Sequence, residues 1–161
     1  MEKGNIKAHR DEKNHFTVLI ERSAFDDTAI SRIQKMVEAM VHILRKAIGT
    51  DSLEISIKDD VVAFPWFTAS EPAVEQAYTD FVELLCDRAV EMNRASDILR
   101  ESENERYAMR GFLIQLGAIG RDYSTMRKIM TRNLSGSAAY KGKKRKEEMV
   151  AEELLAEMAG A

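Results

Sequence analysis

The stretch LEISIKDDVVAFPWF, residues 53–67, decides the fold, because it reads as two strands joined by a tight turn. Its first half alternates apolar and polar residues, a period of two that is typical of a strand with one buried face. Two adjacent aspartates favour a turn, and residues 61–67 return as an apolar strand. Pro65 has no N–H to donate, so we expect this strand to lie at a sheet edge or to end there.

The residues on either side of this hairpin complete an α+β core over 15–98. Residues 16–21, FTVLIE, have the β-branched and aromatic density of a strand. Apolar residues then recur at steps of three and four over 28–48, which predicts one long helix that stops at a glycine. A second long helix is expected over 70–92. The order β-α-β-β-α predicts a three-stranded antiparallel or mixed sheet covered by helices on one face.

A helical hairpin is predicted after this core. Helical patterns over 102–116 and 122–134 are separated by Gly117-Ala118-Ile119-Gly120. Ser102 and Glu105 have the spacing of a capping box at the start of the first helix. Two helices joined by a short glycine-bounded turn resemble a helix-turn-helix in outline.

Composition sets the boundaries of the segments that lie outside the α+β core. Residues 1–14 are polar and charged and are expected to form a flexible tail. The basic helical hairpin occupies 99–140, and residues 141–161 begin with a basic run and continue as a short acidic helix over 147–158.

The charge of the chain is unevenly divided. The formal net charge is −3, yet residues 106–146 contain eleven Lys or Arg and one acid, Asp122. Such an asymmetry suggests two surfaces with different partners. The basic segment is a candidate for contact with phosphate or with an acidic protein face. Alternatively, the opposite charges neutralise each other within the fold or across a dimer.

Length and composition exclude several classes of protein. A chain of 161 residues that is 45% hydrophobic can bury a core without disulfides, and Cys86 is the only cysteine. No apolar run approaches the roughly 20 residues that cross a bilayer, and the polar N-terminus does not resemble an export signal. We therefore expect a cytosolic protein without a membrane partner.

The residues that commonly carry chemistry do not converge on a catalytic or metal site. Cys86 has apolar residues at helical spacing, and the neighbouring acids Glu83 and Asp87 would raise the pKa of its thiol. The histidines have no second ligand at metal-binding spacing: His9, His15 and His42. We expect no enzymatic activity, no cofactor and no metal.

The C-terminal third carries the candidate binding residues. Arg121, Thr125, Lys128 and Arg132 are spaced by 4, 3 and 4 and form one basic stripe, which Arg127 flanks. Exposed cations on one helix face are what contact with phosphate requires. The stripe has few amides for reading bases, so backbone contact is favoured over sequence-specific recognition. Beyond it, an aromatic residue that could stack on a base precedes five cations: Tyr140, Lys141, Lys143, Lys144, Arg145 and Lys146.

Three aromatic residues surround Pro65. Strict alternation puts Phe64 and Trp66 on one face of the strand and Phe67 on the other. These rings either form the core beneath a helix or lie on an exposed edge strand that captures a partner by strand addition.

Four pieces of the C-terminal third resemble a known family: residues 105–110, residues 116–120, Tyr123 with residues 127–130, and residues 133–140. They include Leu116-Gly117-Ala118-Ile119-Gly120 and Asn133-Leu134-Ser135-Gly136. This pattern, over residues 103–142, is similar to poorly characterised proteins from phages, prophages and plasmids of gut Gram-positive bacteria, sometimes labelled virulence-related. The resemblance implies a mobile genetic element and a bacterial host cytosol.

These observations together favour a non-enzymatic accessory protein of a phage or plasmid. The leading hypothesis is anti-CRISPR-like counter-defence, in which the basic hairpin binds a host nucleoprotein or its DNA or RNA. One alternative is a helix-turn-helix transcription regulator, acting as a homodimer on paired half-sites. Another is a structural adaptor that pairs with a partner chain through the Phe64–Trp66 strand or the 147–158 helix.

Overall fold

The computed structural model has the α+β class that the sequence predicts, and it describes residues 6–10, 15–69, 71–91 and 103–136. Its sheet has four antiparallel strands, one more than the sequence predicts, in the order β1-β2-β4-β3. The bounds of the strands are β1 Ile6–Arg10, β2 His15–Glu21, β3 Ser56–Ile57 and β4 Val61–Thr68.

The first strand lies in the segment that the sequence predicts to be a flexible tail, so that prediction is wrong for Ile6–Arg10. Its backbone pairs with β2, with Ile6 opposite Ile20 and Arg10 opposite Phe16. Edge strands commonly carry charged residues and need few apolar ones, because only one of their sides is paired. The composition of IKAHR therefore resembles that of a solvated tail.

Pro65 lies in an internal strand, contrary to the predicted edge position, because β4 is flanked by β2 and β3. A β-bulge accommodates the proline. In the pairing of β2 with β4, Val18 is opposite Phe64 and Phe16 is opposite Phe67, so the register shifts between these two pairs, where Pro65 lies. On its other side, β3 pairs only with the first part of β4. The bulge also brings Phe67 to the same face as Phe64, where strict alternation predicts opposite faces.

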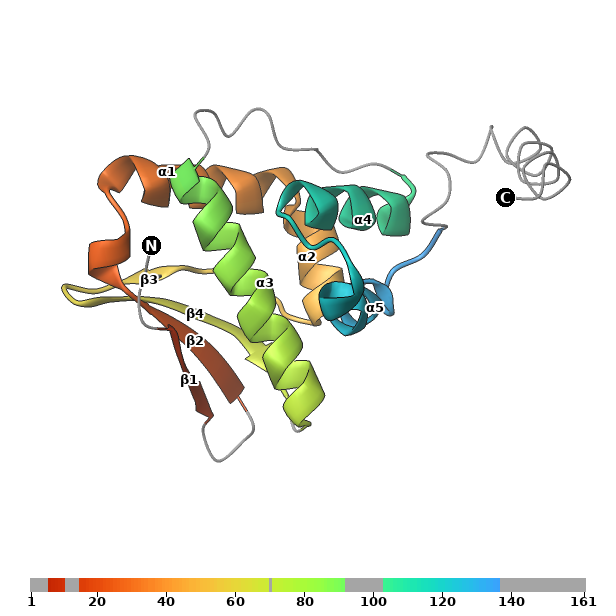
Figure 1. Ribbon diagram of the computed structural model, residues 1–161, viewed down its shortest axis with the longest axis horizontal. Helices are drawn as coiled ribbons and strands as arrows, with labels where there is room; N and C mark the ends of the chain where they lie inside the picture. The colour runs from red at the N-terminus through yellow and green to blue at the C-terminus, as the bar shows by residue number, and fades with distance from the viewer. Residues whose placement is uncertain (1–5, 11–14, 70, 92–102, 137–161) are drawn as a thin grey trace, which may run out of the picture.

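The single helix predicted over 28–48 is present as two helices that follow a 3₁₀ turn: η1 Arg22–Ala24, α1 Asp27–Ala39 and α2 Val41–Ile48. Met40 separates the helices with φ −122° and ψ 21°, outside the helical range, and its side chain is fully buried. Gly49 ends α2 in the left-handed conformation, as predicted. The break turns α2 away from the direction of α1 and toward the C-terminal helices (Figure 1).

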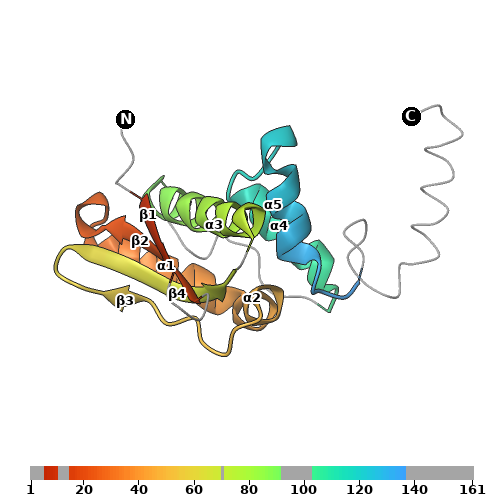
Figure 2. The same cartoon turned by 90° about the horizontal axis from the view of Figure 1, so that it is seen from below.

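The second long helix is present as α3, Pro72–Glu91, and it crosses one face of the sheet (Figure 1). Its Tyr78 stacks on Phe67 of β4 with ring centroids 4.4 Å apart. About one turn further along α3, Phe81 packs against Phe112 of the C-terminal hairpin. Consequently α3 lies between the sheet and the hairpin, as both views show (Figures 1 and 2), and one hydrophobic core includes residues of both.

The C-terminal hairpin consists of three short elements: α4 Glu105–Gln115, η3 Arg121–Tyr123 and α5 Ser124–Thr131. Its last helix is shorter than the predicted helix over 122–134. The cap of α4 also differs from the prediction, since it is Asn104 and not Ser102. The Asn104 Oδ1 accepts a hydrogen bond from the backbone N–H of Tyr107 at 3.1 Å.

Candidate nucleic-acid interface

The predicted basic stripe lies on the surface of η3 and α5. Arg121, Lys128 and Arg132 are exposed, whereas Met126 and Met130 are 2% and 0% exposed and pack into the core. The spacing in the sequence therefore correctly separates a polar face from an apolar one. What distinguishes the cations from one another is the set of contacts that each side chain makes.

Arg121 and Lys128 are the least engaged members of the stripe. Within residues 6–10, 15–69, 71–91 and 103–136, neither side chain has an ion pair or a hydrogen bond to the protein. Arg110 on α4 is also exposed and has no such contact within the same residues. These guanidinium and ammonium groups are accordingly available to a ligand without breaking a hydrogen bond or ion pair to any residue that the structure describes.

Arg127 has a different role from the one that its position beside the stripe suggests. It is half-buried, and its Nη1 donates hydrogen bonds to the backbone carbonyls of Ala118 and Gly120, each at 2.9 Å. Both acceptors lie in the turn between α4 and η3. Arg127 therefore holds the shape of this turn, a contact that sequence spacing alone does not reveal.

Arg132 connects α5 to α3. Its guanidinium hydrogen-bonds the hydroxyl of Tyr78, which is only 3% exposed. Burial raises the pKa of Tyr78, and the nearby positive charge of Arg132 partly offsets that rise. Arg132 therefore has a structural contact in addition to its exposed face.

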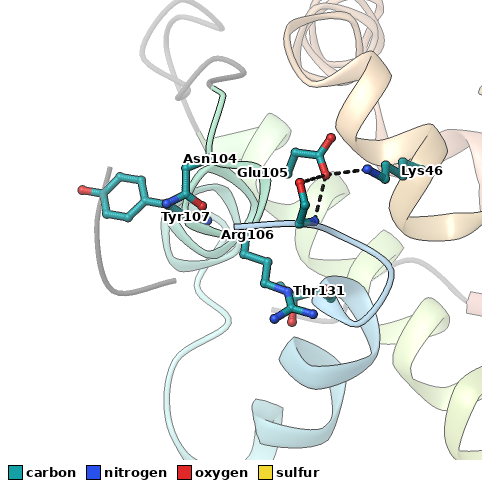
Figure 3. Close-up of polar contacts among 7 residues, drawn as sticks. Lys46, Asn104, Glu105, Arg106, Tyr107 and Thr131 are labelled. Carbon is teal, nitrogen blue, oxygen red and sulfur yellow. Dashed lines mark hydrogen bonds and ion pairs between the residues drawn. The ribbon is translucent and has the colours of Figure 1, made fainter. Parts of the chain in front are cut away.

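The base of the hairpin is held by the carboxylate of Glu105 (Figure 3). Its Oε1 accepts hydrogen bonds from Lys46 Nζ on α2 at 2.8 Å and from the backbone N–H and hydroxyl of Ser135, both at 2.9 Å. The bonds from Lys46 and Ser135 lower the pKa of Glu105 from its usual value. Beside it, Arg106 Nε donates to the carbonyl of Thr131 at the end of α5.

The segment after α5 is fixed to the same region. Asn133, the amide that could have read a base, instead donates through Nδ2 to the carbonyl of Ala47 at 3.1 Å. Gly136 has φ +92° and approaches Asn104 so closely that a Cβ atom would collide with the Asn104 side chain. The sequence Asn133-Leu134-Ser135-Gly136 thus has structural roles at nearly every position, including the buried Leu134.

Six predicted binding residues lie outside the described residues: Tyr140, Lys141, Lys143, Lys144, Arg145 and Lys146. The helix predicted over 147–158 also lies outside them. They remain predictions from the sequence. Arg121, Lys128 and Arg132 are thus the described members of the candidate site that face solvent.

Cys86 is a structural residue, as its apolar neighbours at helical spacing indicate, since it is 4% exposed and belongs to the core. Burial raises the pKa of its thiol well above the usual value, and Asp87 and Glu83 add to the rise. Among the residues that the structure describes, no group of three or more His, Cys, Asp or Glu could hold a metal ion. None of the described helices combines the length and apolar character that crossing a membrane requires.

The exposed-edge interpretation of the aromatic strand is wrong, because Phe64 and Trp66 are 0% and 3% exposed. The indole Nε1 of Trp66 donates to the carbonyl of Glu54 at 2.8 Å. Both rings belong to the core, and they contact each other edge to face with ring centroids 5.2 Å apart.

Sequence reasoning did not single out Ile119 as a candidate for contact. It is 64% exposed, more than the other exposed large hydrophobic residues of the described chain, Ile57 at 45% and Val90 at 41%. The signal was present in Gly117-Ala118-Ile119-Gly120, where an isoleucine lies between two glycines in a turn.

Comparison with protein-family models, with curated proteins and with solved structures gives no match to this chain.

Proposed function

We propose that this protein is a non-enzymatic nucleic-acid-binding protein that contacts phosphate groups through Arg121, Lys128 and the exposed part of Arg132. The observation that carries the proposal is the free state of Arg121 and Lys128: their charges are exposed and have no partner within the described part of the chain. Cations in this state can neutralise phosphates and release the counterions that surround them.

The rigidity of the hairpin supports this assignment. Arg127 holds the turn before η3, Glu105 holds the start of α4 to α2 and to Ser135, and Asn133 holds the end of α5 to α2. The cations are consequently presented on a backbone that need not be ordered when a ligand binds. Pre-organisation of this kind reduces the entropic cost of association.

Phosphate contact is favoured over base reading. The Asn133 amide is bonded to Ala47, so the stripe offers charged donors but no free amide of its own. The basic run over 141–146 would add cations and make binding steeply dependent on salt. Recognition would then depend mainly on charge and on the shape of the nucleic acid.

The proposed biological setting is counter-defence in the cytosol of a bacterial host, on a phage or plasmid. This part of the proposal rests on the sequence resemblance over residues 103–142. A nucleoprotein such as a CRISPR effector presents phosphate next to protein surfaces, and a protein with acidic and basic regions suits such a target.

A helix-turn-helix regulator is the second candidate, favoured by the succession of α4, a glycine-bounded turn and α5 with its exposed stripe. It predicts preference for one DNA sequence and binding as a homodimer. The third candidate, a structural adaptor, loses one of its two proposed contacts because Phe64 and Trp66 are buried. The helix that the sequence predicts over 147–158, which lies outside the described residues, remains as its proposed contact.

The test is fluorescence anisotropy of labelled duplex DNA, single-stranded DNA and RNA over a salt series. The double variant R121A/K128A is compared with K35A/K58A, which removes the same charge at exposed lysines of α1 and the β3–β4 turn. R121A/K128A should reduce the slope of log K against log salt by about 2, about 1 for each lost phosphate contact. Equal slopes for the two variants, or no binding by the wild type at low salt, would refute the assignment.

A further inference from the structure

The turn that carries Ile119 is held rigidly on both sides of that residue. On the α4 side, Gly117 has φ +97°, and the backbone N–H groups of Gly117 and Ala118 donate to the carbonyls of Ile114 and Leu113. This pair of bonds is a Schellman motif, which fixes the end of a helix. Ala118 itself is 0% exposed and anchors the turn in the core.

Arg127 completes the support from the α5 side. Its Nη1 donates to the carbonyls of Ala118 and Gly120, the two residues that flank Ile119. Within the turn, the N–H of Ile119 donates to the carbonyl of Gly117 at 2.8 Å. An apolar side chain is thus held out in solvent by a backbone with little freedom, although exposure of Ile119 does nothing for the hydrophobic core.

Glycines lie on both sides of Ile119 in the turn, and a cationic residue follows them. Gly117 and Gly120 are exposed and have no side chain, and a Cβ atom at either would meet no other atom within 4 Å. Arg121, two residues after Ile119, is exposed, and its side chain has no ion pair or hydrogen bond within the described residues. The turn therefore presents one apolar side chain, an open backbone on both sides and an adjacent cation.

This arrangement suits a nucleic-acid duplex better than a protein face. A protein interface needs a core of several apolar or aromatic residues and about 800 Å² on each partner, whereas this apolar feature is a single side chain. Architectural DNA-binding proteins, in contrast, insert one Ile, Leu, Met or Phe between base pairs while neighbouring cations contact the phosphates. The glycines would allow the backbone to approach the groove closely.

We propose, on the basis of the nucleic-acid binding proposed above, that Ile119 inserts as a wedge between base pairs of double-stranded DNA while Arg121 contacts the adjacent phosphate. Insertion requires two neighbouring base pairs to unstack. The preferred ligand is therefore DNA that is already kinked or easily unstacked, and the recognised feature is deformability.

The experiment compares two DNA duplexes that differ only by two unpaired nucleotides in one strand, which form a bulge where the neighbouring base pairs are already unstacked. Anisotropy titrations are made with the wild type, with Ile119→Ser and with Ile57→Ser. The last variant makes the same change at another exposed isoleucine, on β3 at the far side of the molecule from α5 (Figure 2). Both isoleucines are exposed, so both variants should retain the wild-type melting temperature.

The wild type and Ile57→Ser should bind the bulged duplex about tenfold more tightly than the continuous one, because unstacking is already complete. Ile119→Ser should bind both duplexes equally, with the wild-type salt dependence on the continuous duplex. A wild-type ratio near 1, or an unchanged ratio in Ile119→Ser, would overturn insertion and leave phosphate binding intact. Absence of binding to both duplexes at low salt would overturn this inference, whereas the proposed function would be overturned only if single-stranded DNA and RNA also failed to bind.

Discussion

Replacement of Glu105 by glutamine should destabilise the attachment of the hairpin to the rest of the fold. Glu105 connects three segments that are distant in sequence: α4, α2 through Lys46, and the residues after α5 through Ser135. Glutamine has the same shape and keeps an oxygen acceptor, but it lacks the negative charge. The variant therefore measures what the charge adds to these contacts.

The expected loss follows from the exposure of the two partners. The Lys46 side chain is 49% exposed and that of Glu105 is 23% exposed, so their ion pair is worth about 0.2–1 kcal/mol. A hydrogen bond from Ser135 to a carboxylate contributes about 1 kcal/mol more to the free energy of unfolding than the same bond to a neutral amide. Glu105→Gln should accordingly lower the free energy of unfolding by about 1–2 kcal/mol, or the melting temperature by about 2–8 °C.

The free energy of unfolding that Glu105→Gln loses should also depend on pH in a defined direction. The contacts lower the pKa of Glu105 in the folded protein, so its stabilising contribution is present above the unfolded pKa, about 4.3. It is lost as the pH falls through the lower, folded pKa. Urea titrations should thus show the full deficit at pH 7 and a shrinking one as the pH falls below about 4.

Lys46→Met provides the control, because it removes the ion pair and leaves the bonds from Ser135. Lys46→Met should lower the free energy of unfolding by less than Glu105→Gln does at pH 7. Equal stability of Glu105→Gln and the wild type at pH 7, or a deficit that is the same at pH 7 and pH 3.5, would refute this account.

Three further outcomes follow from contacts in the hairpin. Arg127→Gln should cost about 1–3 kcal/mol in urea titrations and speed amide exchange in the turn, because two carbonyls lose a charged donor; unaltered exchange would contradict this. Gly136→Ala should cost about 2 kcal/mol or more, since its φ is +92° and its Cβ would collide with Asn104; wild-type stability would count against that close approach. Asp122→Asn should tighten duplex binding about two- to fivefold by removing the acid next to the basic stripe, and unchanged affinity would place the ligand elsewhere.

Local patterns in the sequence predicted most of the elements. The alternation over 53–57 was read correctly only in part, because Leu53 and Ile55 pack against the core whereas Ile57 is 45% exposed, and the strand itself is limited to Ser56–Ile57. The steps of three and four over 28–48 depend on which residues face the core, and these were read correctly. The break at Met40 was not, because Met40 continues the apolar spacing of the helix and is itself buried. After the break, α2 contacts α4 and α5 of the hairpin, and these contacts with distant residues have no signature in the local spacing.

The two sheet predictions that were wrong have a related cause. The segment Ile6–Arg10 becomes a strand because β2 offers a free edge, and its own composition is that of a tail. Pro65 is tolerated inside the sheet because a bulge in the pairing with β2 accommodates it and β3 ends before reaching it. Both outcomes depend on the neighbouring strand, which a reading of one segment at a time does not include.

In the candidate site, spacing identified the exposed cations but could not separate ligand-binding groups from structural ones. Arg127 and Lys128 are adjacent and both basic, yet Arg127 bonds two backbone carbonyls while Lys128 faces solvent. Nine residues separate Arg127 from Ala118, and this distance has no signature in a helical repeat. Ile119 was overlooked for the opposite reason, since apolar residues are expected to be buried and only the structure shows this one exposed.

The residues on which the proposed resemblance rests are chiefly residues that shape the hairpin. Gly117, Gly120 and Gly136 adopt positive φ, Asn133 bonds Ala47, and Ser135 bonds Glu105. A protein that shares these residues would be expected to share the turn and the attachment of the hairpin, whatever it binds. The ligand would be decided by positions that the architecture leaves free: Ile119, Arg121 and Lys128. Variation at those three positions among proteins with the same glycine and asparagine pattern would therefore indicate different targets on one common scaffold.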